Sequence, residues 1–193
     1  MNTICVFCGS SPGNDPAYIA GAKAMGAAMA SRSLKLVYGG SGIGMMGAIA
    51  NAVLEGGEEV IGVIPKALAT KERAHQGITE IHVVSSMHER KAMMADLAGA
   101  FVAMPGGMGT LEELCEIITW AQLGIHTKPI GLLNLRGYFD GFKAFLGHMV
   151  DQGFLASYHR DLVVIRSEPD ELIEALKDYR HSGGGIWMDA TES

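Results

Sequence analysis

Long apolar runs are absent from this sequence of 193 residues. No stretch reaches the ~18–20 consecutive apolar residues that a membrane-spanning helix requires. The N-terminal segment, MNTICVFCGSS, lacks the basic region of a secretory signal peptide. Cysteine is scarce, since the chain has 3 residues of this type, and the odd number favours reduced thiols over a disulfide framework. These absences together predict a cytoplasmic protein that does not bind a membrane.

Positive charge is also in deficit. The 15 lysines and arginines face 21 aspartates and glutamates, so the net charge is −6. This balance argues against a general nucleic-acid-binding protein, which usually carries a basic face. One small phosphate ligand remains compatible with it, because backbone N–H groups can bind such an anion locally.

Signatures of metal sites and of nucleoside-triphosphate hydrolysis are missing as well. The 7 histidines show no H-E-x-x-H or comparable ligand spacing. Cys5 and Cys8 form a C-x-x-C pattern, but they lie in an expected strand and should face opposite sides of it. No G-K-[ST] sequence follows a glycine-rich turn, so a Walker A loop is absent. We therefore expect neither a metal nor another cofactor.

What the sequence does contain is a regular alternation of short apolar segments with longer amphipathic ones. Hydrophobic residues make up 48% of the chain, enough for a sizeable core. Most short segments are continuously apolar (ICVFC, LKLVY, AFVAM), which is typical of strands covered on both faces of a parallel sheet. The pattern predicts a single α/β domain over residues 1–180, with helices on both faces of a doubly wound parallel sheet. Residues 181–193 are expected to form a flexible tail.

The expected strands are Thr3–Cys8, Leu34–Tyr38, Glu59–Ile64, Glu80–Val84, Ala100–Met104, Pro129–Asn134 and Leu162–Ile165. The expected helices cover residues 15–32, 43–56, 86–98, 110–124, 138–152 and 169–179. Residues 66–79 show no clear apolar period, so we expect a loop or a short helix there. Open parallel sheets bind ligands outside the carboxyl ends of their strands, so the strand-to-helix turns are the candidate sites.

The first turn, CGSSPGND at residues 8–15, can place small side chains and backbone N–H groups beside a ligand. It fits equally well an ordinary glycine turn in which Asp15 or a serine caps the next helix.

The second turn, YGGSGIGMMG at residues 38–47, contains the G-x-G-x-x-G pattern of dinucleotide-binding proteins. Its supporting acid is missing, since Lys66 stands near the end of the next strand. A phosphate or nucleotide cradle is therefore favoured there over a full dinucleotide site, with close helix packing as the alternative.

The third turn, PGGMGTLEE at residues 105–113, follows an expected strand and precedes an expected helix. A glycine-rich turn at a helix N-terminus offers unpaired N–H groups and the positive end of the helix dipole, so phosphate is the expected ligand. Larger residues at Gly106, Gly107 or Gly109 would block close approach or demand an unfavourable φ. Thr110 and Glu113 also match a capping box with Thr110 as the N-cap. The spacing alone leaves a structural and a chemical role for Glu113 open.

The fourth turn, SSMHERKAMM at residues 85–94, has a second possible capping box in Ser86 and Glu89. Arg90 and Lys91 follow at the start of the helix, where the helix dipole disfavours positive charge. Arg90 shares a helix face with apolar residues and is expected to point partly inward. The two cations are either solvated or placed to meet an anion.

Two of these motifs together resemble the Lonely Guy family of phosphoribohydrolases. PGGMGTLEE and SMHERKA match that family's P-G-G-x-G-T-x-x-E pattern with its upstream Arg-Lys pair, in the same order. The resemblance extends to CVFCGSS, LVYGG, VIGVIPK and ITWAQLGIH, and covers roughly residues 3 to 165. It implies a Rossmann-like fold, commonly in a homodimer with active sites near the interface.

The resemblance also implies an activity, which is hydrolysis of the N-glycosidic bond of a purine riboside 5′-monophosphate. The products would be a free base, which in plants is a cytokinin, and ribose 5-phosphate; AMP is a further expected substrate. Many members are labelled lysine decarboxylase, but nothing in this sequence indicates a lysine that holds pyridoxal phosphate. Carried over by position, Arg90 and Glu113 resemble the catalytic pair.

The candidate substrate-binding residues come from the resemblance and from the turns described above. They are Glu72, Lys91, Gly106, Gly107, Met108, Gly109, Thr110, Leu111, Glu112, Thr119, Gly9, Ser10, Gly39 and Gly40. Two other classes of protein remain in competition. A nucleotide-binding or carrier protein would share the phosphate site but would not need the acid. An NAD(P)-dependent oxidoreductase would rest on Gly42, Gly44 and Gly47.

Overall fold

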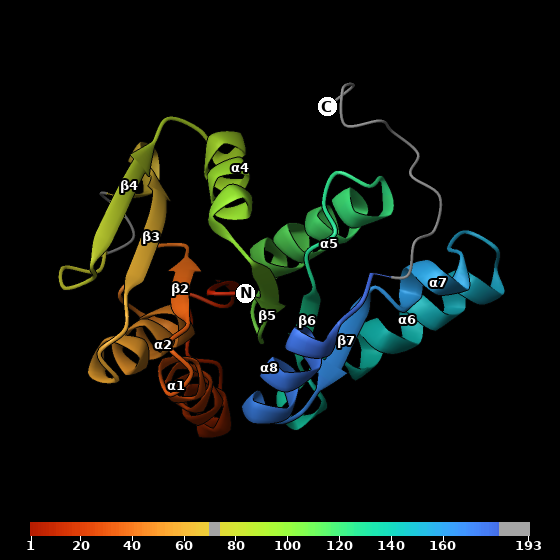
Figure 1. The fold of residues 1–193 in the computed structure, drawn as a ribbon, viewed down its shortest axis with the longest axis horizontal. Helices are drawn as coiled ribbons and strands as arrows, with labels where there is room; N and C mark the ends of the chain where they lie inside the picture. Colours follow the sequence, from red (N-terminus) through yellow and green to blue (C-terminus); the bar gives the residue numbers. More distant parts are fainter. Residues whose placement is uncertain (70–73, 182–193) are drawn as a thin grey trace.

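Seven parallel strands form one sheet in the computed structural model, which describes residues 1–69 and 74–181 (Figure 1). The strand order is β4-β3-β2-β1-β5-β6-β7. The strands are β1 (Thr3–Phe7), β2 (Lys35–Tyr38), β3 (Val60–Pro65), β4 (Glu80–Val84), β5 (Ala100–Ala103), β6 (Ile130–Leu133) and β7 (Val163–Arg166). All of the expected strands are therefore confirmed, as is the α/β fold class with its parallel sheet.

Helices connect the strands and cover both faces of the sheet. They are α1 (Pro16–Ala30), α2 (Gly44–Glu55), α3 (Lys66–Ala69), α4 (Met87–Leu97), α5 (Met108–Gln122), α6 (Asp140–Asp151), α7 (Ser157–Arg160) and α8 (Pro169–Asp178), with a 3₁₀ turn, η1 (Leu135–Gly137). The short helix α3 begins the segment for which the sequence predicted a loop or a short helix, whereas α7 was not predicted. None of the described helices has the length and apolar character needed to cross a membrane. Glu72 and the expected tail after residue 181 lie outside the described residues.

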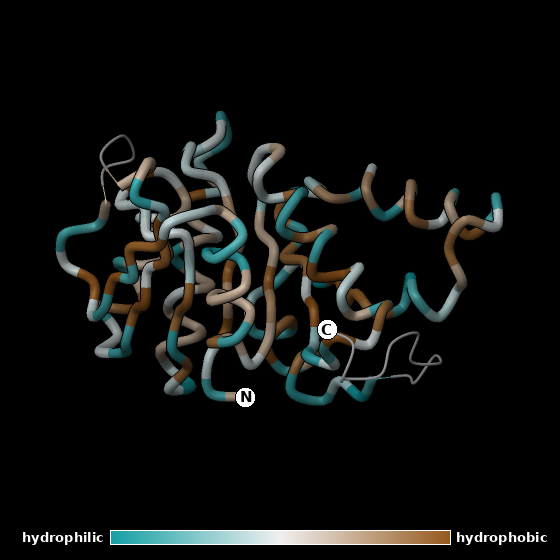
Figure 2. The backbone as a smooth tube through the Cα atoms, turned by 90° about the horizontal axis from the view of Figure 1, so that it is seen from above, coloured by the Kyte–Doolittle hydropathy of each residue, from teal (hydrophilic) through white to brown (hydrophobic). Residues whose placement is uncertain are grey.

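Two apolar clusters make up the core, one on each face of the sheet. Helices α1, α2 and α8 pack on one face and α4 and α5 on the other (Figure 1). Cys8 belongs to the first cluster and Cys5 to the second, which confirms that the C-x-x-C pattern spans opposite faces. Apolar residues run through the central strands, as the continuously apolar segments of the sequence require (Figure 2).

The strand order reverses at β1, which pairs with β2 on one side and with β5 on the other. The connections that leave β1 and β5 run to opposite faces, and this divergence is where open α/β sheets bind ligands. The Gly9 N–H donates to the carbonyl of Pro105 at 3.0 Å, so the turn after β1 lies directly against the turn after β5. The first and third glycine-rich turns are thereby joined in one place.

The N-caps of α1 and α4 are those that the sequence predicted, whereas the N-cap of α5 is a different residue. The Asp15 carboxylate caps α1 by accepting from Ala17 N–H at 2.9 Å, and the Ser86 hydroxyl caps α4 by accepting from Glu89 N–H at 3.1 Å. Helix α5 begins two residues earlier than predicted, with Gly107 as an N-cap that has no side chain to offer. The predicted capping box of Thr110 and Glu113 is therefore wrong.

Candidate active site

Arg90 and Glu113 lie side by side in the interior, although both are charged residue types. Their exposed fractions are 6% and 5%. Nη1 of Arg90 lies 3.5 Å from Oε1 of Glu113, while Nε of Arg90 donates to the carbonyl of Val63 at 3.0 Å. Burying an ion pair costs free energy that a hydrophobic pair would not, so the fold retains these groups at the expense of stability. Such a cost is typical of a functional site.

Burial raises the pKa of Glu113 from its ordinary 4.5 to about 7, although the Arg90 charge acts in the opposite direction. A carboxyl group with a pKa close to neutral can both take up and release a proton at physiological pH, which suits a general acid or base. Because α5 begins at Met108, Glu113 lies in the second turn of the helix and cannot cap it. The structural role that the sequence left open for Glu113 is thus removed.

The start of α5 supplies hydrogen-bond donors without acceptors. Among residues 1–69 and 74–181, no group accepts a hydrogen bond from the N–H of Met108, Gly109 or Thr110. These are the first three N–H groups of a helix of 15 residues, where the dipole favours an anion. A β-carbon at Gly107 or Gly109 would meet no atom within 4 Å, so the space in front of the helix is open. This end of α5 has the properties of a phosphate-binding site.

The two features open into one pocket. It has a volume of about 200 Å³ and lies in front of the buried pair. Its walls combine residues from the turns after β1 and β5 with Met46 of α2, Arg90 of α4 and residues of α5. They are Cys8, Gly9, Ser10, Met46, Arg90, Gly107, Gly109, Thr110 and Glu113. An anion at the helix start and a reacting group at Glu113 would share the same pocket.

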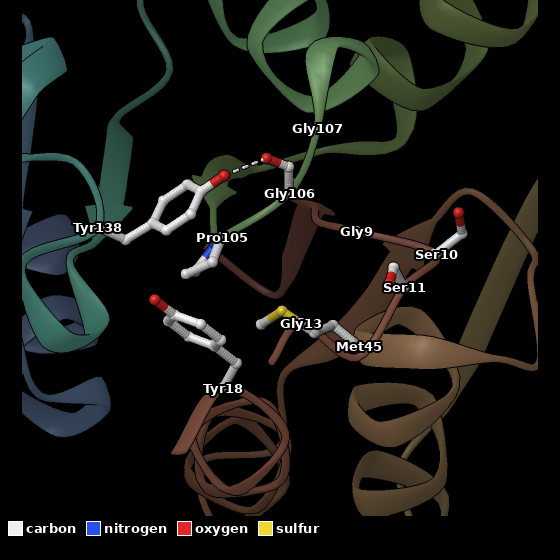
Figure 3. Close-up of a pocket in the computed structure, with 10 residues that line it drawn as sticks. All are labelled: Gly9, Ser10, Ser11, Gly13, Tyr18, Met45, Pro105, Gly106, Gly107 and Tyr138. Atoms are coloured by element: carbon white, nitrogen blue, oxygen red, sulfur yellow. Dashed lines mark hydrogen bonds between the residues drawn. The ribbon is translucent and has the colours of Figure 1, made fainter. Parts of the chain in front are cut away.

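A second pocket of about 260 Å³ shares Gly9, Ser10 and Gly107 with the first (Figure 3). Its other walls are Ser11, Gly13, Tyr18, Met45, Pro105, Gly106 and Tyr138. The sequence analysis did not single out Tyr18, Met45, Met46 or Tyr138. Tyr138 follows the carboxyl end of β6, so its place at the ligand edge of the sheet was a usable signal.

The glycines of the second turn support the site without lining it. A β-carbon on Gly47 would overlap the Gly42 carbonyl, and one on Gly44 would overlap the Ser10 carbonyl. These glycines therefore allow backbone to pack on backbone, and within the described residues none of them lines either pocket. This is the packing alternative for the G-x-G-x-x-G pattern. Gly39 makes room for the Arg90 guanidinium, and Gly40 has a positive φ of 80°.

Lys91 is occupied by carboxylates of the neighbouring helix. Its Nζ lies 2.5 Å from Oε1 of Glu112 and 2.9 Å from Oε1 of Glu116, so it ties α4 to α5. These ion pairs hold the helix that carries Arg90 against the helix that carries Glu113. Met108 has an exposed fraction of 79% and does not line the pocket.

Thr119 does not reach this pocket. It lies six residues after Glu113, which at 100° per residue places it on a different side of α5. Its hydroxyl donates to the carbonyl of Cys115 at 2.7 Å, and it lines an apolar groove between α5 and α6 together with Leu146 and Met149. Within one chain, Thr119 is therefore separate from Arg90 and Glu113.

Comparison with known proteins finds relatives over most of the chain. The family model described as "possible lysine decarboxylase" matches residues 46–176. The chain is 50% identical over 176 residues to cytokinin riboside 5′-monophosphate phosphoribohydrolase LOG1 of Arabidopsis thaliana, covering 91% of this chain and 83% of the relative. It is 47% identical over 188 residues to the phosphoribohydrolase LOG of Oryza sativa subsp. japonica, covering 96% and 78%.

Solved structures with lower identity share the fold. The molybdenum cofactor carrier protein of Chlamydomonas reinhardtii superposes with a TM-score of 0.68 at 22% identity, covering 91% of this chain and 96% of its own. The molybdenum cofactor binding protein of Rippkaea orientalis gives a TM-score of 0.67 at 21% identity, covering 91% and 95%.

The fold and site thus define a Rossmann-like α/β protein with a buried acid beside a helix start whose first N–H groups have no acceptor in the described part of the chain. The chain belongs to the LOG family of cytokinin riboside 5′-monophosphate phosphoribohydrolases, which the family model of possible lysine decarboxylases includes. The resemblance in the sequence motifs is therefore confirmed.

Proposed function

We propose that this protein hydrolyses the N-glycosidic bond of purine riboside 5′-monophosphates, cytokinin ribotides and AMP among them. The products are the free base and ribose 5-phosphate. The observation that carries the proposal is the pairing of Glu113, a buried carboxyl with a pKa of about 7, with the unpaired N–H groups at the start of α5. Relatives at about half identity carry the name of this activity.

The 5′-phosphate binds at the start of α5, where Gly107, Gly109 and Thr110 line the pocket. Binding energy from this remote group positions the sugar with its anomeric carbon toward Glu113. The C1′–N bond breaks, its electron pair leaves with the base, which takes up a proton, and water adds to C1′ with loss of a proton. In its ionised form, Glu113 stabilises the positive charge on the sugar and accepts the proton of the attacking water.

Arg90 acts beside Glu113 in the same pocket. Its guanidinium is fixed by Val63 and adjoins Glu113, so it can orient the substrate or assist departure of the base. A carrier protein that only binds nucleotides has no need of a buried acid next to its phosphate site. The pair therefore favours catalysis over simple binding.

The test is product chromatography after incubation of purified protein with AMP, adenosine and isopentenyladenosine monophosphate. We expect free base from both monophosphates, little from adenosine, and none with Glu113→Gln. Glu171→Gln on the exposed surface of α8 is the matched control and should retain activity. Comparable rates with adenosine and AMP would contradict the phosphate-binding role of α5. Binding of AMP without release of adenine would instead indicate a carrier protein.

We also propose that two copies associate through the region of α5, α6 and α7. Phe145 and Phe154 there have exposed fractions of 53% and 90%, and each directly precedes a residue, Leu146 or Leu155, that lines the apolar groove containing Thr119. Apolar segments recur along this end of the chain (Figure 2). A second copy that covers these side chains accounts for their exposure in the single chain. Light scattering should give a dimer, and Phe154→Ser should weaken it.

The proposed location is the cytoplasm. Cys5, Cys8 and Cys115 are free thiols within the described structure, which suits a reducing compartment.

A further inference from the structure

Tyr138 has no role in the bond cleavage proposed above, but it contacts the turn that precedes α5. Its hydroxyl donates a hydrogen bond to the carbonyl of Gly106 at 2.5 Å, from the turn after β6 to the turn after β5 (Figure 3). Gly106 immediately precedes Gly107, the N-cap of the helix whose N-terminus faces the pocket. A side chain from a distant part of the sequence therefore holds the peptide at the start of the phosphate site.

The turn that carries Tyr138 is built to place it. Arg136 and Gly137 both have positive φ, of 55° and 72°, which is costly for Arg136. The Asn134 side chain accepts from the Phe139 N–H at 2.7 Å and donates to Asp140 at 2.7 Å. A strained turn closed by two short hydrogen bonds leaves Tyr138 little freedom of position.

The packing around the ring fixes its direction further. The ring of Tyr138 packs edge-on against Tyr18, with centroids 5.8 Å apart, and against Phe139, at 5.1 Å. Such edge-to-face pairs contribute free energy beyond burial alone. These contacts orient the hydroxyl toward Gly106 and do not depend on the hydroxyl itself.

The hydrogen bond has an electrostatic consequence for an anion. A peptide bond is planar and trans, so the Gly107 N–H points opposite to the Gly106 carbonyl that Tyr138 holds. If this peptide rotated, a carbonyl oxygen would face the phosphate in place of an N–H donor, and the two negative groups would repel. Fixing the carbonyl keeps the donor side of the peptide available to the ligand.

We propose that Tyr138 is a positioning residue that holds the Gly106–Gly107 peptide in the orientation that binds the 5′-phosphate. It thereby contributes to the preference for phosphorylated over unphosphorylated nucleosides. The inference rests on the proposed function for its substrate, but the binding of ribose 5-phosphate tests it without turnover. Tyr138 does not touch the reacting atoms, so its effect falls on binding.

The experiment compares Tyr138→Phe with the wild-type protein. Phenylalanine keeps the ring contacts and removes the hydroxyl. We expect about a fivefold increase in KM for AMP and a similar loss of affinity for ribose 5-phosphate by calorimetry, because one hydrogen bond is lost where water can partly replace it. The kcat should change less than KM, and the rate with adenosine should stay the same.

Tyr18→Phe is the matched comparison, since Tyr18 lines the same pocket and its hydroxyl donates to no acceptor in the described part of the chain. Its effect on ribose 5-phosphate affinity should be smaller than that of Tyr138→Phe. Gly137→Ala is a second test of the role of Tyr138. A β-carbon at Gly137 would lie 2.6 Å from Oδ2 of Asp140 and would displace the turn that carries Tyr138. It should produce the same phosphate-selective loss.

An unchanged affinity of Tyr138→Phe for ribose 5-phosphate would overturn the inference. So would an equal fall in activity toward AMP and adenosine, because that result would indicate a general structural role. If the wild-type protein binds AMP without hydrolysing it, the proposed function fails. The calorimetric comparison of Tyr138→Phe with wild type then still decides the role of Tyr138.

Discussion

Gly39, at the end of β2, leaves the space that the guanidinium of Arg90 occupies. A β-carbon at this position would overlap Nη2 of Arg90 and lie 3.3 Å from Sδ of Met46. The conformation of Gly39 does not itself require glycine, because its φ is not positive. The absence of a side chain at one residue is therefore what allows a buried cation at another.

Gly39→Ala should displace Arg90 from Glu113. Because small misplacements of catalytic groups are costly, we expect a fall in kcat/KM of roughly 10- to 100-fold with the fold retained. Steady-state kinetics and thermal unfolding measure the two effects. Gly77→Ala is the control, since a β-carbon there meets only His75, at 3.6 Å. Wild-type activity in a folded Gly39→Ala variant would show that the position of Arg90 does not matter.

Gly109→Ala should separate stability from substrate binding. The residue lies in the first turn of α5, where alanine favours the helix by about 0.5–1 kcal/mol, and the new methyl group would meet no protein atom. It would occupy the space in front of the unpaired N–H groups. We expect an unchanged or higher unfolding temperature and a KM for AMP raised about tenfold or more.

Gly106→Ala should behave in the opposite way. A β-carbon at Gly106 would overlap the Thr110 hydroxyl and lie 2.8 Å from the Gly9 nitrogen, so the turns after β1 and β5 must separate. We expect a clear fall in unfolding temperature, measured by calorimetry. Equal stability of the Gly106 and Gly109 variants would contradict the different surroundings of the two glycines.

Glu113 should make stability depend on pH in an unusual direction. Its folded pKa of about 7 exceeds its ordinary value of 4.5, so between these pH values the folded protein holds a proton that the unfolded chain releases. Stability therefore falls as pH rises through this window, by roughly 3 kcal/mol in total, and the penalty is fully present above pH 7. Glu113→Gln removes this dependence.

Denaturant unfolding at pH 5 and pH 8 measures the effect. The stability of Glu113→Gln relative to wild type should increase between these pH values. Activity should follow the ionised form, so kcat/KM of the wild type should rise to a plateau above about pH 7. A stability difference that is independent of pH would refute the raised pKa.

Lys91→Met should weaken the attachment of α4 to α5. Lys91 is the shared partner of Glu112 and Glu116, and its side chain has an exposed fraction of 10%. Methionine keeps much of the apolar stem, so the loss is that of the ion pairs, about 1 kcal/mol of unfolding free energy. If Lys91 also contacts the phosphate, KM for AMP will rise beyond what the lower stability explains. Kinetics and chemical denaturation on one preparation separate the two.

Much of the fold followed from local patterns. The continuously apolar segments located most of the strands, because a strand buried on both faces tolerates few polar residues. Asp15 and Ser86 marked two helix starts, since their side chains bond to N–H groups only two or three residues away. The start of α5 was misplaced because Gly107 caps through backbone conformation, which leaves no side-chain signal.

Only part of the candidate site could be predicted from the sequence. The residues of PGGMGT and Arg90 were found because their motifs are contiguous. Tyr138 was missed, since its relation to Gly106 spans 32 residues and depends on β5 and β6 being neighbours in the sheet. Thr119 was grouped with the substrate residues, although its six-residue spacing from Glu113 within one helix places the two on different sides of α5.

The sequence by itself determined the alternation of strands and helices, the parallel sheet, and a glycine-rich turn able to receive an anion. These features rest on interactions within a few residues or on a simple apolar period. Only the tertiary structure decided that Glu113 is buried against Arg90 and does not cap a helix. Burial, and with it a pKa near 7, comes from the packing of α4, α5 and β3 around one carboxyl group, and no single segment of the sequence contains that information.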